Sequence, residues 1–396
     1  MLKYLPGICI ICRRSRFSYP KVQGFETVRI ANVDSLAEYI IEEGSANMAE
    51  KTIYLDRNEN NYGPAPACYE VLKAAGFETL SWYSKDFARG VKSTLSERIA
   101  KEFGVPESII LLGYGAEDLL KQAVHCFLSR NETIMIPTHS WWYYKSIADE
   151  KGGITVEYPM VPGPDSFHYE VKSLLDLAAK HRPRLILISS PNNPTGNTLD
   201  LKDLKVLVRT IKNTVIVLDE AYWGFTGHQA DYVKELIGEY PELLIIRTFS
   251  KYYALAGVRI GYAFLGKNLT TLAQFSARYL GYNRLSERLA LAALDSRDYY
   301  AEISQKMIRD KERYYQTLGA IPGFKAYRSN ANFILAEIPE RFKASLKDYL
   351  TKQGLIIKFF NEPNLENCVR ITIGTEEQNL MLTNAFRDFA RDKGLI

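Results

Sequence analysis

A lysine, an aspartate and an arginine each follow a short apolar run, where the loops of α/β proteins bind ligands. The run 243–248 leads to Lys251, the run 215–219 ends in Asp219, and Arg259 comes shortly after Lys251. A lysine placed between a buried strand and a small, glycine-bearing segment is partly desolvated. Its amine therefore has a lowered pKa and can form a Schiff base with a carbonyl compound.

Each residue also has a simpler interpretation. Lys251 could be a solvated loop lysine, which is the usual position of this residue type. Asp219 could cap a helix or bind a metal, although no cluster of histidines or carboxylates with ligand spacing shares its loop. The sequence therefore favours amine chemistry over a metal site.

Short apolar runs alternate with amphipathic segments from residue 109 onward. Continuous apolar runs are typical of strands buried on both faces, and their alternation with helices predicts an α/β fold with a mostly parallel sheet. In such sheets ligands bind beyond the carboxyl ends of the strands. The runs are IILLG (109–113), TIMIP (133–137), LILISS (185–190), VIVLD (215–219), LLIIRT (243–248) and IGYAFL (260–265).

The last third of the chain has a different pattern. Long helical runs over 285–318 precede short alternating strands at 332–338 and 368–374, which predicts a smaller α+β domain. We expect three parts: an extension over 1–50, a large domain over 91–290, and a small domain formed by 51–90, as an N-terminal arm, with 291–396.

The composition narrows the class of protein. The chain has 396 residues, of which 46% are hydrophobic and 24% charged, as in ordinary globular proteins. A net charge of +4 is too small to indicate a nucleic-acid partner. No apolar run approaches the roughly 20 residues that a membrane helix needs. The five cysteines are scattered, which suits free thiols in a reducing cytoplasm.

Seven segments in order resemble the fold-type-I aminotransferases, and within them the histidinol-phosphate aminotransferases. The resemblance covers roughly residues 53 to 391, and the segments fall where the predicted strands place ligand loops. It implies pyridoxal 5′-phosphate as cofactor and a ping-pong Schiff-base exchange between an amino donor and a 2-oxo acid. The segments are LDRNENNYGPAP (55–66), GYGAED (113–118), SPNNPTG (190–196), LDEAY (218–222), TFSKYYALAGVRIGY (248–262), ANFIL (331–335) and VRITIGT (369–375).

The resemblance implies roles for four residues around the cofactor ring. Lys251 would hold the cofactor and move the proton at the substrate α-carbon. Asp219 would keep the pyridine nitrogen protonated, which makes the ring an electron sink. Tyr222 and Asn193 would bind the ring hydroxyl oxygen.

Five further residues would bind the cofactor phosphate. Ala116 and Glu117 follow a glycine pair at a predicted helix start, where amide groups and the helix dipole attract an anion. The acidic side chain there could instead only complement the dipole. The resemblance adds the side chains of Thr248, Ser250 and Arg259.

The resemblance also implies a homodimer with shared active sites. Tyr83 matches a tyrosine that reaches the phosphate of the other subunit. Arg370 matches the arginine that binds the substrate carboxylate, which a planar guanidinium does with two parallel hydrogen bonds. Arg370 could instead form a surface ion pair.

The sequence departs from this family in two places. His139 occupies the position of the aromatic residue that stacks on the cofactor, and Trp142 is a rival for that role. Lys358 stands near the position of an arginine that binds the substrate phosphate, which weakens the case for histidinol phosphate. We expect four residues to contact the amino donor and determine which donor is accepted: Asn60, Tyr62, Trp142 and Lys358.

The sequence leaves two other functions open. One is a decarboxylase resembling the threonine-phosphate decarboxylases, which would use the same cofactor residues. The other is a non-catalytic partner module, although all the expected cofactor residues are present. Residues 30–44 resemble the tail of a nucleotidyltransferase domain, which would make the extension the remnant or linker of a fused domain.

Overall fold

The computed structural model describes residues 52–227 and 232–396. Residues 52–396 form one compact unit. The predicted extension and its resemblance to a nucleotidyltransferase tail lie outside the described residues. The predicted domain boundaries stay a prediction.

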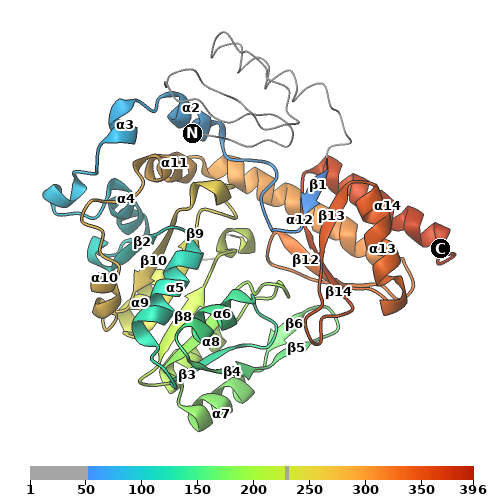
Figure 1. Ribbon diagram of the computed structural model, residues 1–396, viewed down its shortest axis with the longest axis horizontal. Coiled ribbons are helices and arrows are strands. Elements are labelled where there is room, and N and C mark those ends of the chain that lie inside the picture. The colour runs from blue at the N-terminus through green and yellow to red at the C-terminus, as the bar shows by residue number, and fades with distance from the viewer. Residues whose placement is uncertain (1–51, 228–231) are drawn as a thin grey trace, which may run out of the picture. The chain divides into compact units, whose positions relative to one another are not determined.

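Within the described residues, a mostly parallel seven-stranded sheet carries the predicted apolar runs (Figure 1). All of its neighbouring strands pair in parallel except β10, which is antiparallel to β2 and β9. The predicted α/β class with a mostly parallel sheet is confirmed. In spatial order the strands are β2 (Ile110–Gly113), β10 (Gly261–Leu265), β9 (Leu243–Thr248), β8 (Val215–Asp219), β7 (Leu185–Ser189), β3 (Thr133–Pro137) and β4 (Ile154–Tyr158).

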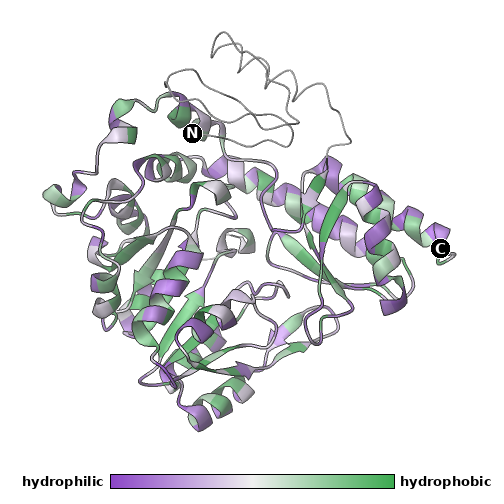
Figure 2. Cartoon of the chain, in the orientation of Figure 1, coloured by the Kyte–Doolittle hydropathy of each residue, from purple (hydrophilic) through white to green (hydrophobic). Residues whose placement is uncertain are grey.

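Alternate residues of each central strand enter two different cores. In β9, Leu243 and Ile245 pack into one cluster, and Leu244 and Ile246 pack into the other. Since both faces are covered, the strands have no polar face, and Figure 2 shows them as largely hydrophobic. One core includes α4 (Thr94–Phe103), α7 (Val171–His181), α8 (Leu201–Thr210), α9 (Val233–Glu239) and α11 (Arg284–Leu294), and the other includes α5 (Ala116–Phe127), α6 (Tyr143–Glu150) and α10 (Thr270–Phe275).

Within the described residues, a second sheet of five strands includes one strand from the start of the compact unit and four from its last third. Its first strand pairs in parallel with β13, which lies about 300 residues later in the chain. This sheet carries the strand that holds Arg370. In spatial order the strands are β1 (Ile53–Leu55), β13 (Leu355–Phe359), β14 (Cys368–Thr372), β12 (Phe333–Glu337) and β11 (Lys325–Tyr327), and the nearby helices are α12 (Arg297–Gly319), α13 (Glu340–Lys352) and α14 (Glu376–Asp392).

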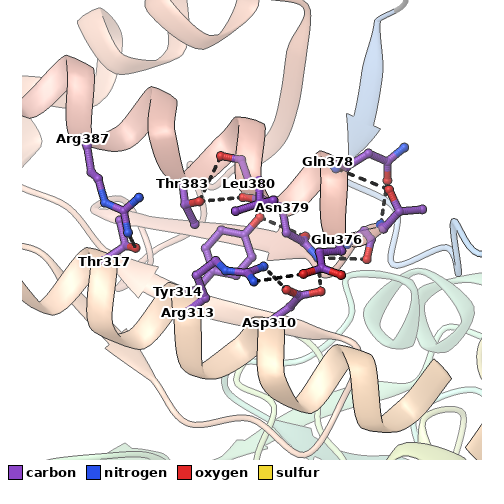
Figure 3. Close-up of polar contacts among 12 residues, drawn as sticks. Asp310, Arg313, Tyr314, Thr317, Glu376, Gln378, Asn379, Leu380, Thr383 and Arg387 are labelled. Carbon is purple, nitrogen blue, oxygen red and sulfur yellow. Dashed lines mark hydrogen bonds and ion pairs between the residues drawn. The ribbon is translucent and has the colours of Figure 1, made fainter. Parts of the chain in front are cut away.

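A buried polar cluster between α12 and α14 fixes the turn that follows β14 (Figure 3). The Asn379 amide nitrogen donates to Asp310 at 2.8 Å and to the Gly374 carbonyl at 3.0 Å. Its oxygen accepts from the Gly374 N–H at 2.9 Å and from the Tyr314 hydroxyl at 3.1 Å. All four hydrogen bonds of the amide are satisfied, so the end of the strand that carries Arg370 is rigidly held.

The remaining elements are short. No helix among residues 52–227 and 232–396 has the length and apolar character needed to span a bilayer. The remaining short elements are α2 (Pro66–Lys73), α3 (Phe77–Ser81), β5 (Met160–Pro162), β6 (Phe167–Tyr169) and single turns at Asp86–Arg89, Glu107–Ile109, Trp223–Thr226 and Ala256–Val258.

Candidate active site

A pocket of about 360 Å³ lies at the carboxyl ends of β7, β8 and β9 and reaches β13 and β14 of the second sheet. This is the position that the strand pattern predicts for a ligand site. Twelve of the predicted site residues line it: Ala116, Glu117, Trp142, Asn193, Asp219, Tyr222, Thr248, Ser250, Lys251, Arg259, Lys358 and Arg370.

The Lys251 amine lies in this pocket and donates to the carbonyl oxygen of Arg57 at 3.0 Å. Burial lowers the pKa of Lys251 to about 8, and the positive charges of Arg370 and Arg259 act in the same direction. Glu59 opposes them. About half of the amine is therefore neutral near pH 8, as a nucleophile requires.

The Asp219 carboxylate is buried at the end of β8 and accepts two hydrogen bonds. Its Oδ2 accepts from the Tyr144 hydroxyl at 2.6 Å, and its Oδ1 accepts from the Ala221 N–H at 3.0 Å. Burial raises the pKa of Asp219, while both hydrogen bonds oppose that effect. A cation beside this carboxylate would complete its charge balance.

Tyr144 is a pocket residue that the sequence analysis missed. It is fully buried in α6 and spaced like the core residues Ile147 and Ala148. In the sequence it therefore resembles an ordinary packing side chain. Its partner Asp219 is 75 residues away, so no local signal marks the contact.

Arg370 is partly buried beside Asn193, and one of its nitrogens has no partner within the described residues. Its Nη1 donates to Asn193 Oδ1, and its Nη2 donates to the Asp56 carbonyl. Its Nε is buried and makes no hydrogen bond within the described residues. Burial lowers the pKa of Arg370. A partly buried guanidinium with unused hydrogen-bonding capacity fits an incoming carboxylate.

A cradle for an anion lies at the start of α5. Gly115 has φ of +88°, and a Cβ there would lie 2.9 Å from Arg259 Nη2. The guanidinium contacts the Ser250 hydroxyl at 3.4 Å and Glu117 at 3.3 Å, and Thr248 bonds to Ser250 at 3.0 Å. The first amides of α5 have no partner within the helix itself, and together with the hydroxyls and the guanidinium they fit a phosphate group.

Four predicted residues do not line the pocket. The His139 ring packs against Phe167 with centroids 5.7 Å apart, whereas Trp141 and Trp142 line the pocket. The assignment of the stacking residue, His139 or its rival Trp142, stays a prediction. The other three predicted residues outside the pocket have different surroundings. Asn60 donates to the Tyr252 carbonyl at 3.0 Å, Tyr62 lies beside the Lys306 ammonium, and Tyr83 is 70% exposed.

Lys358 shares the outer part of the pocket with a carboxylate. It is the register partner of Arg370 in the β13–β14 pairing, so both side chains lie on one face of the sheet. Its ammonium is 4.0 Å from Glu362, which also lines the pocket. The negative charge of Glu362 was not foreseen, and it reduces the attraction of Lys358 for a phosphate.

Comparison with known proteins places this site in a family. Residues 50–386 match the model of the family "Aminotransferase class I and II". The chain therefore belongs to the class I and II aminotransferases. The enzyme is a pyridoxal-phosphate-dependent transaminase, as the resemblance predicts, and it exchanges an amino group between an amino donor and a 2-oxo acid.

Its relatives refine this assignment. The chain is 31% identical over 341 residues to a histidinol-phosphate aminotransferase of Ruminiclostridium cellulolyticum, covering 85% of this chain and 92% of the relative. A similar protein of Gluconacetobacter diazotrophicus is also 31% identical, over 84% and 90% of the two chains. The structure of histidinol-phosphate aminotransferase from Sinorhizobium meliloti with pyridoxal-5′-phosphate superposes with a TM-score of 0.76 at 23% identity, covering 86% and 92%. The enzyme is thus like the histidinol-phosphate aminotransferases.

Proposed function

We propose that the pocket binds pyridoxal phosphate with its phosphate at the start of α5 and its ring nitrogen at Asp219. The fit rests on the anion cradle around Gly115 and on the buried Asp219 carboxylate, which accepts from Tyr144 and Ala221 but has no cationic partner within the described residues. When bound, the cofactor supplies an electron sink for negative charge at the substrate α-carbon.

Lys251 provides the reactive amine of this chain. Its lowered pKa makes the neutral form available near neutral pH, and the same amine can accept and return the proton of the substrate α-carbon. The single observation that carries the proposal is the convergence of this amine with Asp219, Arg259 and Arg370 in one pocket.

Arg370 binds the carboxylate, phosphate or phosphonate of the amino donor, and the same guanidinium binds the 2-oxo acid in the second half of the reaction. Trp142, Lys358 and Glu362 then contact the rest of the donor at the mouth of the pocket. The donor is an amino acid or a phosphorylated or phosphonate amine. A cytoplasmic location remains a prediction from the cysteine pattern.

Two copies of the chain form the working enzyme. Large apolar side chains are exposed around α3 and after α10, and a patch of this kind marks a protein–protein contact. Tyr83 lies within it and would reach the phosphate site of the partner. The exposed residues are Phe77, Leu80, Tyr83, Phe87, Tyr279 and Leu280, each at least 59% exposed.

The decisive test of the reaction is a half-reaction. The holoenzyme is mixed with one amino donor at a time, and its visible absorbance is followed without any acceptor. We expect a shift that is reversed by 2-oxoglutarate, and no shift in Lys251→Ala. A Lys251→Ala protein that completes the half-reaction would disprove the role of this amine.

The shared site is tested by mixing two impaired proteins. A heterodimer of Tyr83→Ala with Lys251→Ala contains one site with both native residues. We expect the mixture, after subunit exchange, to exceed the summed activity of the two separate variants. An activity equal to that sum would contradict the shared site.

A further inference from the structure

The side chain of Asn58 joins the strand that carries Arg370 to the phenol of Tyr222. Asn58 is buried, and its φ of +56° lies in the left-handed region that asparagine tolerates better than most residues. Its backbone N–H donates to the Thr372 hydroxyl at 2.9 Å. Its side-chain nitrogen donates to the Tyr222 hydroxyl oxygen, also at 2.9 Å. The loop after β1 is thereby tied to both β14 and the cofactor side of the pocket.

Thr372 determines which end of the Asn58 amide faces Tyr222. Its hydroxyl accepts from the Asn58 N–H and donates to Asn58 Oδ1 at 3.2 Å. The amide oxygen is therefore occupied by Thr372, and the amide nitrogen is directed at Tyr222. Asn332 holds the backbone at this point by donating to the Asn58 carbonyl at 3.1 Å.

This arrangement decides where the Tyr222 proton points. A phenol has one proton to donate, and an amide nitrogen donates but does not accept. The Tyr222 proton must therefore point away from Asn58, and Tyr222 lines the pocket. Burial raises the pKa of Tyr222, so the phenol keeps this proton near neutral pH.

We infer that Asn58 is a positioning residue that turns the Tyr222 hydroxyl proton into the pocket, toward the ring oxygen of the cofactor. The inference rests on the proposed binding of the cofactor beside Tyr222. A donated proton favours the anionic form of that oxygen, which lowers the pKa of the nearby cofactor–lysine linkage.

The inference predicts a shift in the pH titration of the visible absorbance of the holoenzyme. Asn58→Asp keeps the shape of the side chain but replaces a donor by an acceptor, so the Tyr222 proton turns toward residue 58. We expect the midpoint to rise by about one pH unit, which corresponds to tenfold tighter proton binding. Asn61→Asp is the matched control, because Asn61 bonds to Gln378 and Tyr54 instead.

A second pair of variants avoids any change of charge. Thr372→Val removes the hydroxyl that orients the Asn58 amide, and Thr372→Ser keeps it. We expect the midpoint to rise in Thr372→Val and to stay near the wild-type value in Thr372→Ser. This pair also decides the question if Asn58→Asp does not fold.

Tyr222→Phe distinguishes a failure of the inference about Asn58 from a failure of the role of Tyr222. If Tyr222→Phe raises the midpoint while Asn58→Asp and Thr372→Val leave it unchanged, the inference is wrong and the proposed function stands. If Tyr222→Phe also leaves it unchanged, the role that the family resemblance implies for Tyr222 fails, and the inference fails with it.

Discussion

The Tyr144 hydroxyl donates to Asp219 Oδ2 at 2.6 Å in the buried base of the pocket. The two residues come from α6 and the end of β8, so the contact joins a helix to the strand that carries the predicted partner of the ring nitrogen. Hydrogen bonds to an ionised, desolvated carboxylate are among the stronger ones in proteins.

Removing this hydroxyl weakens cofactor binding. Tyr144→Phe deprives Asp219 of a hydrogen bond that keeps the carboxylate ionised, and such bonds contribute about 1.5–3 kcal/mol. We expect a roughly tenfold or greater rise in the dissociation constant of pyridoxal phosphate, measured by equilibrium dialysis or fluorescence. Tyr143→Phe, on the neighbouring residue, should leave the constant unchanged. Equal effects of the two variants would show that Tyr144 acts only in packing.

The lowered pKa of Lys251 predicts a pH dependence for cofactor incorporation. Folding lowers this pKa from 10.5 to about 8, so the fraction of neutral amine increases as the pH rises through about 8. We expect the rate of holoenzyme formation from apoenzyme to rise with pH and level off above that value. Stopped-flow absorbance measures it. A midpoint near 10.5 would contradict the desolvated environment.

Arg370 is expected to act in substrate binding. Lysine retains the charge at this position but not the planar fork that binds a carboxylate with two hydrogen bonds. Arg370→Lys should raise the KM for the amino donor and for the 2-oxo acid by about 10–100-fold, with a smaller change in kcat. Arg328→Lys is the control, since Arg328 pairs with Glu312 on the surface. An unchanged KM for both substrates would place the carboxylate elsewhere.

Gly115 keeps the phosphate cradle open. Alanine at this position would be strained at φ of +88°, and its Cβ would lie 2.9 Å from Arg259 Nη2. Gly115→Ala should displace the guanidinium and weaken cofactor binding by at least tenfold, as ultrafiltration of the holoenzyme would show. A Cβ at the nearby Gly257 meets nothing within 4 Å, so Gly257→Ala should bind the cofactor normally.

Glu362 should select against phosphorylated donors. It lies 4.0 Å from Lys358 and repels a doubly charged phosphate at the pocket mouth. Glu362→Gln should raise kcat/KM for histidinol phosphate by about 3–10-fold and leave that for histidinol nearly unchanged. The same gain for both donors would indicate a general effect on the pocket mouth instead of charge selection.

The order of the strand-end residues could be predicted from the chain alone. Buried strands have long apolar runs, so their carboxyl ends are visible without coordinates. Asp219 is the last residue of β8, and Asn193 and Lys251 follow β7 and β9 within a few residues. The predicted mostly parallel sheet depends on the same local pattern, since hydrophobic runs and intervening amphipathic helices are properties of adjacent residues.

The contacts between distant segments were decided only by the tertiary structure. Asn58 and Tyr222 are 164 residues apart, and nothing in their own surroundings shows that one donates to the other. The same holds for Lys358 and Arg370, which are paired across β13 and β14 and line the same pocket. Short sequence patterns report burial and turn chemistry, whereas hydrogen-bond direction and charge pairing depend on which segments the fold brings together.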